Sequence, residues 1–133
     1  MNSRFLMIAS AAVLAAVGIA LSFAPVETLA YFGKPAPGGV PVLLQLTGAL
    51  YLGFAFMNWM AKGSVLGGIY GRAIVMGNFL QFTMGALTLL KAASGSSQGA
   101  FIWTAAVGYA LFALLFGVLL FSDPTAKREH STP

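Results

Sequence analysis

The main feature of the sequence is a succession of four long apolar segments separated by short polar ones. The apolar segments cover residues 5–23, 42–60, 73–90 and 101–121, and none of them contains an acidic or basic residue. Each has about the 20 residues that an α-helix needs to cross the ~30 Å hydrocarbon core of a bilayer. Transmembrane β-strands instead alternate apolar and polar residues, and these segments do not. The pattern predicts an all-α, polytopic membrane protein with a four-helix transmembrane bundle, as one domain over residues 1–121.

The first apolar segment has a second interpretation, as a secretory signal peptide. Arg4 precedes an alanine-rich run, and Ala20-Leu21-Ser22 is similar to a small-x-small cleavage site. The run from residue 5 to residue 23 is longer than the ~7–15 apolar residues typical of a signal peptide. A transmembrane helix is therefore the favoured interpretation.

The connection between the first two spans contains signals for a short helix. Pro25 favours a new first helical turn, Glu27 falls in that turn, and Gly33 is suited to end it. The stretch 34–41 that follows is rich in proline and glycine, so we expect it to be extended. These residues predict a short interfacial helix after the first span.

The other polar segments predict no further helix. Residues 67–72 are rich in glycine and predict a tight turn between helices, and residues 91–100 are small and polar, which predicts a flexible hairpin loop. The tail, residues 122–133, is too polar to fold alone and is expected to be disordered.

Composition agrees with a membrane protein, and the positions of the charges predict its orientation. Of the 133 residues, 59% are hydrophobic and 8% are charged, whereas about a quarter of the residues of a soluble domain are charged. Lysine and arginine in short loops tend to remain in the cytoplasm. One side of the predicted spans carries Arg4, Lys62, Arg72, Lys127 and Arg128, and the other carries Lys34 and Lys91. This distribution predicts a multi-pass protein of the bacterial inner membrane with both termini in the cytoplasm. It also accounts for the net charge of +4 without nucleic-acid binding.

Small residues at helical spacing predict where the spans pack against one another. Helices in a bilayer associate through close contact of small residues and through hydrogen bonds between helices. The candidate packing glycines are Gly48, Gly53, Gly85 and Gly117.

Polar side chains inside the spans form the candidate functional cluster. An unpaired amide in hydrocarbon is costly, so Asn78 and Gln81 on the third span are expected to find partners on the second, with Gln45, Thr47 and Asn58 as the candidates. The same cluster could instead contact a ligand, because a few polar groups in an apolar cavity orient a lipophilic molecule. The whole candidate cluster is Gln45, Thr47, Tyr51, Asn58, Asn78, Gln81, Thr88 and Tyr109.

Three charged residues are expected at the membrane interfaces. Lys62 and Arg72 flank the second and third spans on the cytoplasmic side, where long cationic side chains reach the phosphate layer. With Lys127 and Arg128 they could also form a patch for anionic lipids. Glu27 is expected at the start of the short helix, at the opposite interface.

The sequence argues against catalysis. It has no cysteine, its single histidine is His130 in the tail, and no Asp, Glu or His lies within a span. Proton-coupled transport normally uses such a residue inside the membrane. No nucleophile motif, phosphate-binding loop or metal-ligand spacing is present. We therefore predict no catalytic residue, no metal site and no cofactor.

Several local motifs resemble those of small bacterial four-helix membrane proteins of the DoxX-like kind. They are Pro25 with Tyr31-Phe32-Gly33, and the glycine-rich stretch Leu46-Thr47-Gly48-Ala49-Leu50-Tyr51-Leu52-Gly53. The string Asn58-Trp59-Met60-Ala61-Lys62-Gly63, continued by Tyr70-Gly71-Arg72 and Gly77-Asn78-Phe79, resembles a feature of a narrower, uncharacterised group. The resemblance implies a link to respiratory or redox membrane complexes and assigns no catalytic residue.

These observations lead to one favoured function and two alternatives. The favoured function is a non-enzymatic accessory or scaffolding subunit of a membrane complex, or a small homo-oligomer. Its expected partners are membrane lipids, other membrane-protein subunits or further copies of the chain. The first alternative is a binder or carrier of a lipophilic molecule such as a quinone, a lipid or a sterol-like compound. The second is a pore formed by oligomerisation and lined by Asn78, Gln81 and Thr88.

Overall fold

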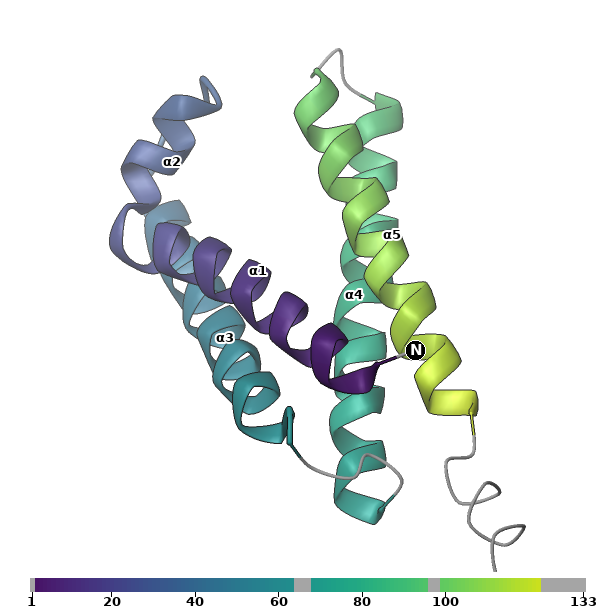
Figure 1. Ribbon diagram of the computed structural model, residues 1–133. Coiled ribbons are helices and arrows are strands. Elements are labelled where there is room, and N and C mark those ends of the chain that lie inside the picture. Colours follow the sequence, from purple (N-terminus) through teal and green to yellow (C-terminus); the bar gives the residue numbers. More distant parts are fainter. Residues whose placement is uncertain (1, 64–67, 96–98, 123–133) are drawn as a thin grey trace, which may run out of the picture. The chain divides into compact units, whose positions relative to one another are not determined.

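The protein is helical throughout the part described by the structure. A computed structural model describes residues 2–63, 68–95 and 99–122, and these residues form helices without any strand. The helices are α1 (Ser3–Phe23), α2 (Pro25–Tyr31), α3 (Val40–Ala61), α4 (Ile69–Gly95) and α5 (Ala100–Phe121) (Figure 1). All but α2 are long and apolar enough to cross a membrane, by length and composition. The all-α fold class, with four long apolar helices compatible with a membrane bundle and a short helix after the first, is confirmed.

The chain divides into two compact units, Met1–Gly63 and Ser64–Pro133. The first contains α1, α2 and α3, and the second contains α4 and α5. Each unit is a helical hairpin and is described by itself below. The single domain predicted for residues 1–121 stays a prediction.

Helix α4 is longer than the apolar segment that predicted it. The tight turn expected at residues 67–72 is wrong for residues 69–72, which form the first turn of α4. The flexible loop expected at residues 91–100 is wrong for residues 91–95, which continue the same helix. Apolar periodicity marks only the membrane-buried part of a helix, whereas alanine and lysine continue a helix well outside it. Residues 67 and 96–98, and the tail from residue 123 onward, lie outside the described residues.

The two cations of α4 are spaced to match a bilayer. Arg72 and Lys91 are 19 residues apart on one continuous helix, a distance of about 28 Å at 1.5 Å per residue. The hydrocarbon core is ~30 Å thick, and both side chains are exposed. A membrane-crossing α4 therefore has one cation at each interface.

Helix α2 begins and ends where the sequence predicts. Pro25 occupies its first turn and Glu27 lies in that turn. At the other end, Gly33 has a φ of 63°, its N–H donates to the carbonyl of Ala30, and the N–H of Lys34 donates to the carbonyl of Leu29, both at 2.9 Å. This pair of hydrogen bonds is a Schellman motif, which needs a residue with positive φ and so favours glycine. The predicted short helix is confirmed, and its position at the membrane interface stays a prediction.

Helices α1 and α3 cross closely at two glycines. A Cβ placed on Gly48 would lie 2.8 Å from the Gly18 carbonyl oxygen and 2.5 Å from Ser22 Oγ, and a Cβ on Gly18 would lie 2.9 Å from Leu52 Cγ. No larger residue fits without moving a backbone. The hairpin is antiparallel, because contacts that advance along α1 from Ser10 to Ser22 retreat along α3 from Asn58 to Gln45.

Helices α4 and α5 pack through aromatic rings set against glycines. Phe82 of α4 is fully buried, and its ring lies 4.8 Å from that of Phe112 and 5.7 Å from that of Phe116, measured between centroids. The ring of Tyr109 covers Gly85, where a Cβ would approach within 2.5 Å of it. Conversely, the ring of Phe79 on α4 lies against Gly117 on α5, where a Cβ would be 3.2 Å from the ring. This hairpin is therefore held by stacked aromatic rings and by rings that pack on glycines.

Candidate functional site

A buried polar contact joins α1 to α3. Asn58 Nδ2 donates a hydrogen bond to Ser10 Oγ at 3.0 Å, and both residues are fully buried. Ser10 Oγ in turn donates to the carbonyl oxygen of Met7 at 3.1 Å. The chain of donors thus ends on the backbone of α1, which fixes the direction of each hydrogen bond. Asn58 was expected to pair with the third span, and its contact with Ser10 was not anticipated.

Two other polar residues of α3 bond to α1 or to their own helix. Gln45 Nε2 donates to the carbonyl oxygen of Ser22 at 3.4 Å, and this carbonyl belongs to the last turn of α1, where helix acceptors lack intrahelical donors. Thr47 Oγ1 donates to the carbonyl oxygen of Leu43 at 2.8 Å, within α3. Tyr51 is half-buried. Gln45 therefore supports the end of α1 rather than a cluster at the centre of a span.

The polar residues of α4 differ in burial. Asn78 is fully buried and its Nδ2 donates to the carbonyl oxygen of Ile74 at 2.9 Å. Gln81 is half-buried, and Thr88 is exposed with its hydroxyl donating to the carbonyl oxygen of Met84 at 2.8 Å. The partnership predicted between these amides and the second span stays a prediction.

Tyr109 of α5 belongs to the aromatic packing of the second hairpin. Its ring meets that of Phe82 edge to face at 5.3 Å between centroids and covers Gly85. Edge-to-face pairs are favoured over a direct sandwich of rings. The position of this side chain thus follows from aromatic packing.

The candidate packing glycines differ in their surroundings. Gly48, Gly85 and Gly117 each lie against a neighbouring helix, as described above. At Gly53, a Cβ would meet no atom within 4 Å. The face of α3 that contacts α1 passes through Gly48 and Ala55, seven residues apart and thus on the same side of the helix. Gly53 lies off that face and takes no part in the α1–α3 contact.

The three interfacial residues lie at helix ends. Glu27 is exposed in the first turn of α2. Arg72 is exposed in the first turn of α4 and lines a shallow hollow with Ala73, Met76, Leu120 and Phe121. Lys62 follows the last residue of α3, and its ammonium lies over the ring of Trp59 at 3.0 Å from the centroid. Lysine over tryptophan at this spacing is a cation–π contact.

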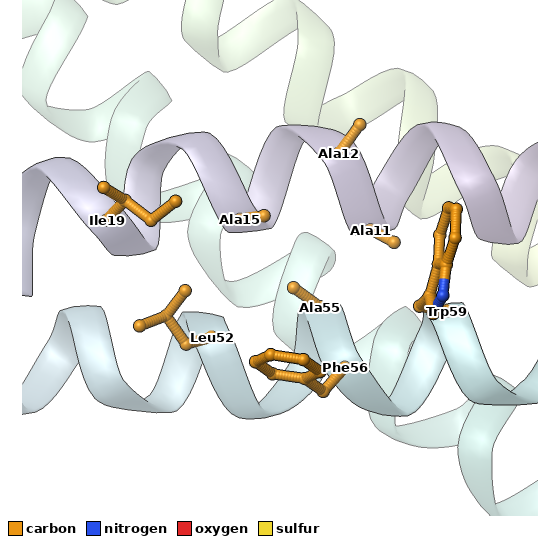
Figure 2. Close-up of a pocket in the computed structure, with 8 residues that line it drawn as sticks. All are labelled: Ala11, Ala12, Ala15, Ile19, Leu52, Ala55, Phe56 and Trp59. Atoms are coloured by element: carbon orange, nitrogen blue, oxygen red, sulfur yellow. The ribbon is translucent and has the colours of Figure 1, made fainter.

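An apolar groove runs between α1 and α3 (Figure 2). Its volume is about 350 Å³. All its lining residues are apolar or aromatic: Ala11, Ala12, Ala15, Ile19, Leu52, Ala55, Phe56 and Trp59. None of the candidate polar residues lines it.

A second apolar groove, of about 600 Å³, lies between α4 and α5. Its one polar lining residue is Thr83, whose hydroxyl oxygen is buried without a hydrogen-bond partner among the described residues. Other threonines of the described helices donate to the carbonyl four residues earlier, as Thr47, Thr88 and Thr104 do. The Thr83 hydroxyl is therefore buried without a hydrogen-bond partner in the described parts of α4 and α5.

Sequence reasoning missed two structural residues, Ser10 and Phe82, and one contact, that of Lys62 with Trp59. Ser10 is the one polar side chain of α1 between Arg4 and Ser22, and that isolation was the available signal. Phe82 gave no signal, because one phenylalanine in an apolar helix is like any other. The Lys62 contact follows from the spacing of three residues from Trp59, which brings two side chains to the same helix face.

Neither a search for metal ligands nor comparison with known proteins adds a further site. The described residues contain no group of three or more His, Cys, Asp or Glu side chains that could hold a metal ion. Comparison of the chain with protein-family models, curated proteins and solved structures found no match.

Proposed function

We propose that this is a non-enzymatic integral membrane protein that acts as an accessory or scaffolding subunit of a membrane complex, or as a small homo-oligomer. The proposal places it in the bacterial inner membrane with both termini in the cytoplasm. Its partners are then membrane lipids and other membrane-protein subunits or further copies of the chain.

One observation carries the proposal: the buried amides make hydrogen bonds within the protein. Asn58 donates to Ser10 across the first hairpin, and Asn78 donates to its own helix. The bond from Asn58 to Ser10 joins two helices, as hydrogen bonds between membrane helices do. The two apolar grooves support the same reading, because no amide lines either of them.

The test is assembly of altered chains in mild detergent. Gly85→Leu, or Asn78→Leu together with Gln81→Leu, removes features that a packed assembly would need. We expect both variants to change the migration of the detergent-solubilised protein and to lower its thermal stability. Unchanged migration and unchanged stability of both would contradict the proposal.

The second candidate is a carrier of a lipophilic molecule. It is favoured by the presence of two grooves of about 350 and 600 Å³, which fall in the range of small-molecule sites. Native mass spectrometry of gently extracted protein separates the two. A stoichiometric small-molecule adduct other than phospholipid that disappears when a groove is filled, by Ala15→Leu or Ala110→Leu, would favour the carrier, and its absence under several extraction conditions would remove it. Absence of conductance in liposomes would remove a pore.

The proposed orientation can be tested by chemical labelling, because the chain has no cysteine of its own. A membrane-impermeant thiol reagent should label Lys34→Cys in right-side-out vesicles and Arg4→Cys in inside-out vesicles. Reaction of both from the same side would overturn the orientation.

A further inference from the structure

We propose that the groove between α1 and α3 binds one acyl chain of an anionic phospholipid, whose phosphate is held by Lys62. The inference begins from the groove itself, which is lined along its whole length by apolar side chains. It extends along α1 from Ala11 to Ile19, a distance of about 12 Å at 1.5 Å per residue. An elongated hydrocarbon chain fits such a shape, and no polar group in the lining would have to give up a hydrogen bond.

One end of the groove joins a positive charge. Trp59 is the lining residue nearest the end of α3, as Figure 2 shows, and the Lys62 ammonium lies over its ring at 3.0 Å. Trp59 therefore contacts the groove and the cation together. Tryptophan side chains prefer the headgroup level of a bilayer, and lysine at a helix end reaches the same level. The end of the groove marked by Trp59 is thus where a lipid changes from chain to headgroup.

The Lys62 ammonium has N–H donors available for a ligand. It carries three N–H donors, and within the described part of the chain Lys62 makes no hydrogen bond or ion pair besides its contact with Trp59. The acidic residue that the structure describes, Glu27, belongs to α2 and so to the opposite end of the hairpin. A phosphate oxygen would accept hydrogen bonds from these donors.

Charge favours an anionic lipid over the other occupants. A zwitterionic headgroup brings its own ammonium, which would compete with Lys62 for the Trp59 ring. A second copy of the chain carries a net charge of +4 and would bring like charge to the groove. An anionic headgroup without an ammonium leaves the Trp59 ring to Lys62 and is attracted by the positive charge of Lys62.

The experiment is native mass spectrometry of the full chain from nanodiscs that contain equal amounts of phosphatidylglycerol and phosphatidylcholine. For the unaltered chain we expect phosphatidylglycerol adducts to dominate. Lys62→Gln should lower the phosphatidylglycerol-to-phosphatidylcholine ratio about fivefold, the effect of one cation near a membrane surface. Lys34→Gln, at the other end of the same hairpin, is the matched charge control and should leave the ratio unchanged.

A second pair of variants tests the groove. Ala15→Leu fills it and should reduce adducts of both lipids about tenfold, roughly the effect of keeping two methylene groups out of an apolar site. Ala16→Leu is the control, because Ala16 is exposed and does not line the groove. Should Ala15→Leu unfold, Ala12→Leu at the exposed rim replaces it.

Two results would overturn the proposal. Equal adducts of the two lipids in the unaltered chain would show that Lys62 does not select a headgroup. Ala15→Leu could instead leave the lipid adducts unchanged while it lowers thermal stability or changes the oligomeric state. That result would assign the groove to contact between protein segments.

Discussion

The backbone of Gly18 and the Cα of Gly48 lie so close that a methyl group on Gly48 would be 2.8 Å from the Gly18 carbonyl oxygen. This contact sets the separation of α1 and α3. Because a Cβ at Gly48 would also meet the backbone nitrogen of Ser22 at 2.7 Å, the neighbour cannot move aside by rotating a side chain. The two helices must separate to accept any larger residue.

Gly48→Ala is therefore expected to destabilise the first hairpin by about 1–3 kcal/mol, the usual cost of overpacking. Gly53→Ala is the matched control on the same helix, since a Cβ there meets nothing within 4 Å. That change should be neutral or stabilising by about 0.5–1 kcal/mol, because alanine is the better helix former. Denaturation by SDS in mixed micelles, followed by circular dichroism, measures both. Equal effects of the two changes would contradict the close approach.

The hydrogen bond from Asn58 to Ser10 should have a measurable coupling energy. Side-chain hydrogen bonds between membrane helices contribute about 0.6 kcal/mol on average and up to ~1.7 kcal/mol. We expect a double-mutant cycle of Ser10→Ala and Asn58→Ala to give a coupling energy within that range. A cycle of Ser10→Ala and Thr47→Val is the control and should give none, because Thr47 bonds within its own helix. Additive effects of Ser10→Ala and Asn58→Ala would show that the bond does not form in the membrane.

Packing of an aromatic ring on a glycine makes a prediction for the second hairpin. Gly85→Ala places a Cβ within 2.5 Å of the Tyr109 ring, so the ring must leave its position beside Phe82. A loss of about 1–3 kcal/mol is expected. At Gly108, on α5, a Cβ meets nothing within 4 Å, and Gly108→Ala should cost nothing. The near-ultraviolet circular dichroism of Gly85→Ala should change as well, and an unaltered aromatic signal would contradict the packing described.

Removing the Thr83 hydroxyl should preserve or raise the stability of the protein, whereas removing the Ser10 hydroxyl should lower it. Thr83→Val keeps the shape of the side chain and removes a buried polar atom that has no partner among the described residues. Burying such an atom costs about 1–3 kcal/mol, so the variant should be as stable as the original chain or more stable. Ser10→Ala should be less stable, because Ser10 both accepts and donates. Destabilisation by Thr83→Val would mean that its hydroxyl has a partner in the membrane.

The sequence was sufficient to predict the helices and insufficient to predict their contacts. Pro25, Glu27 and Gly33 defined α2, since each acts through local backbone geometry. The ends of α4 were missed, because the apolar pattern stops at the membrane boundary while alanine and lysine extend the helix. The partner of Asn58 was missed because an amide can bond to any helix within reach. Only the register of α1 against α3, set by Gly18 and Gly48, brings Ser10 opposite it.

The central claim is that the protein acts through assembly, and the mass of the protein released from native membranes tests it most directly. Native mass spectrometry in mild detergent should give a complex of fixed stoichiometry, either several copies of this chain or this chain with other membrane subunits. A monomer under every mild condition of extraction, or a monomer that carries a stoichiometric small molecule other than phospholipid, would contradict the account.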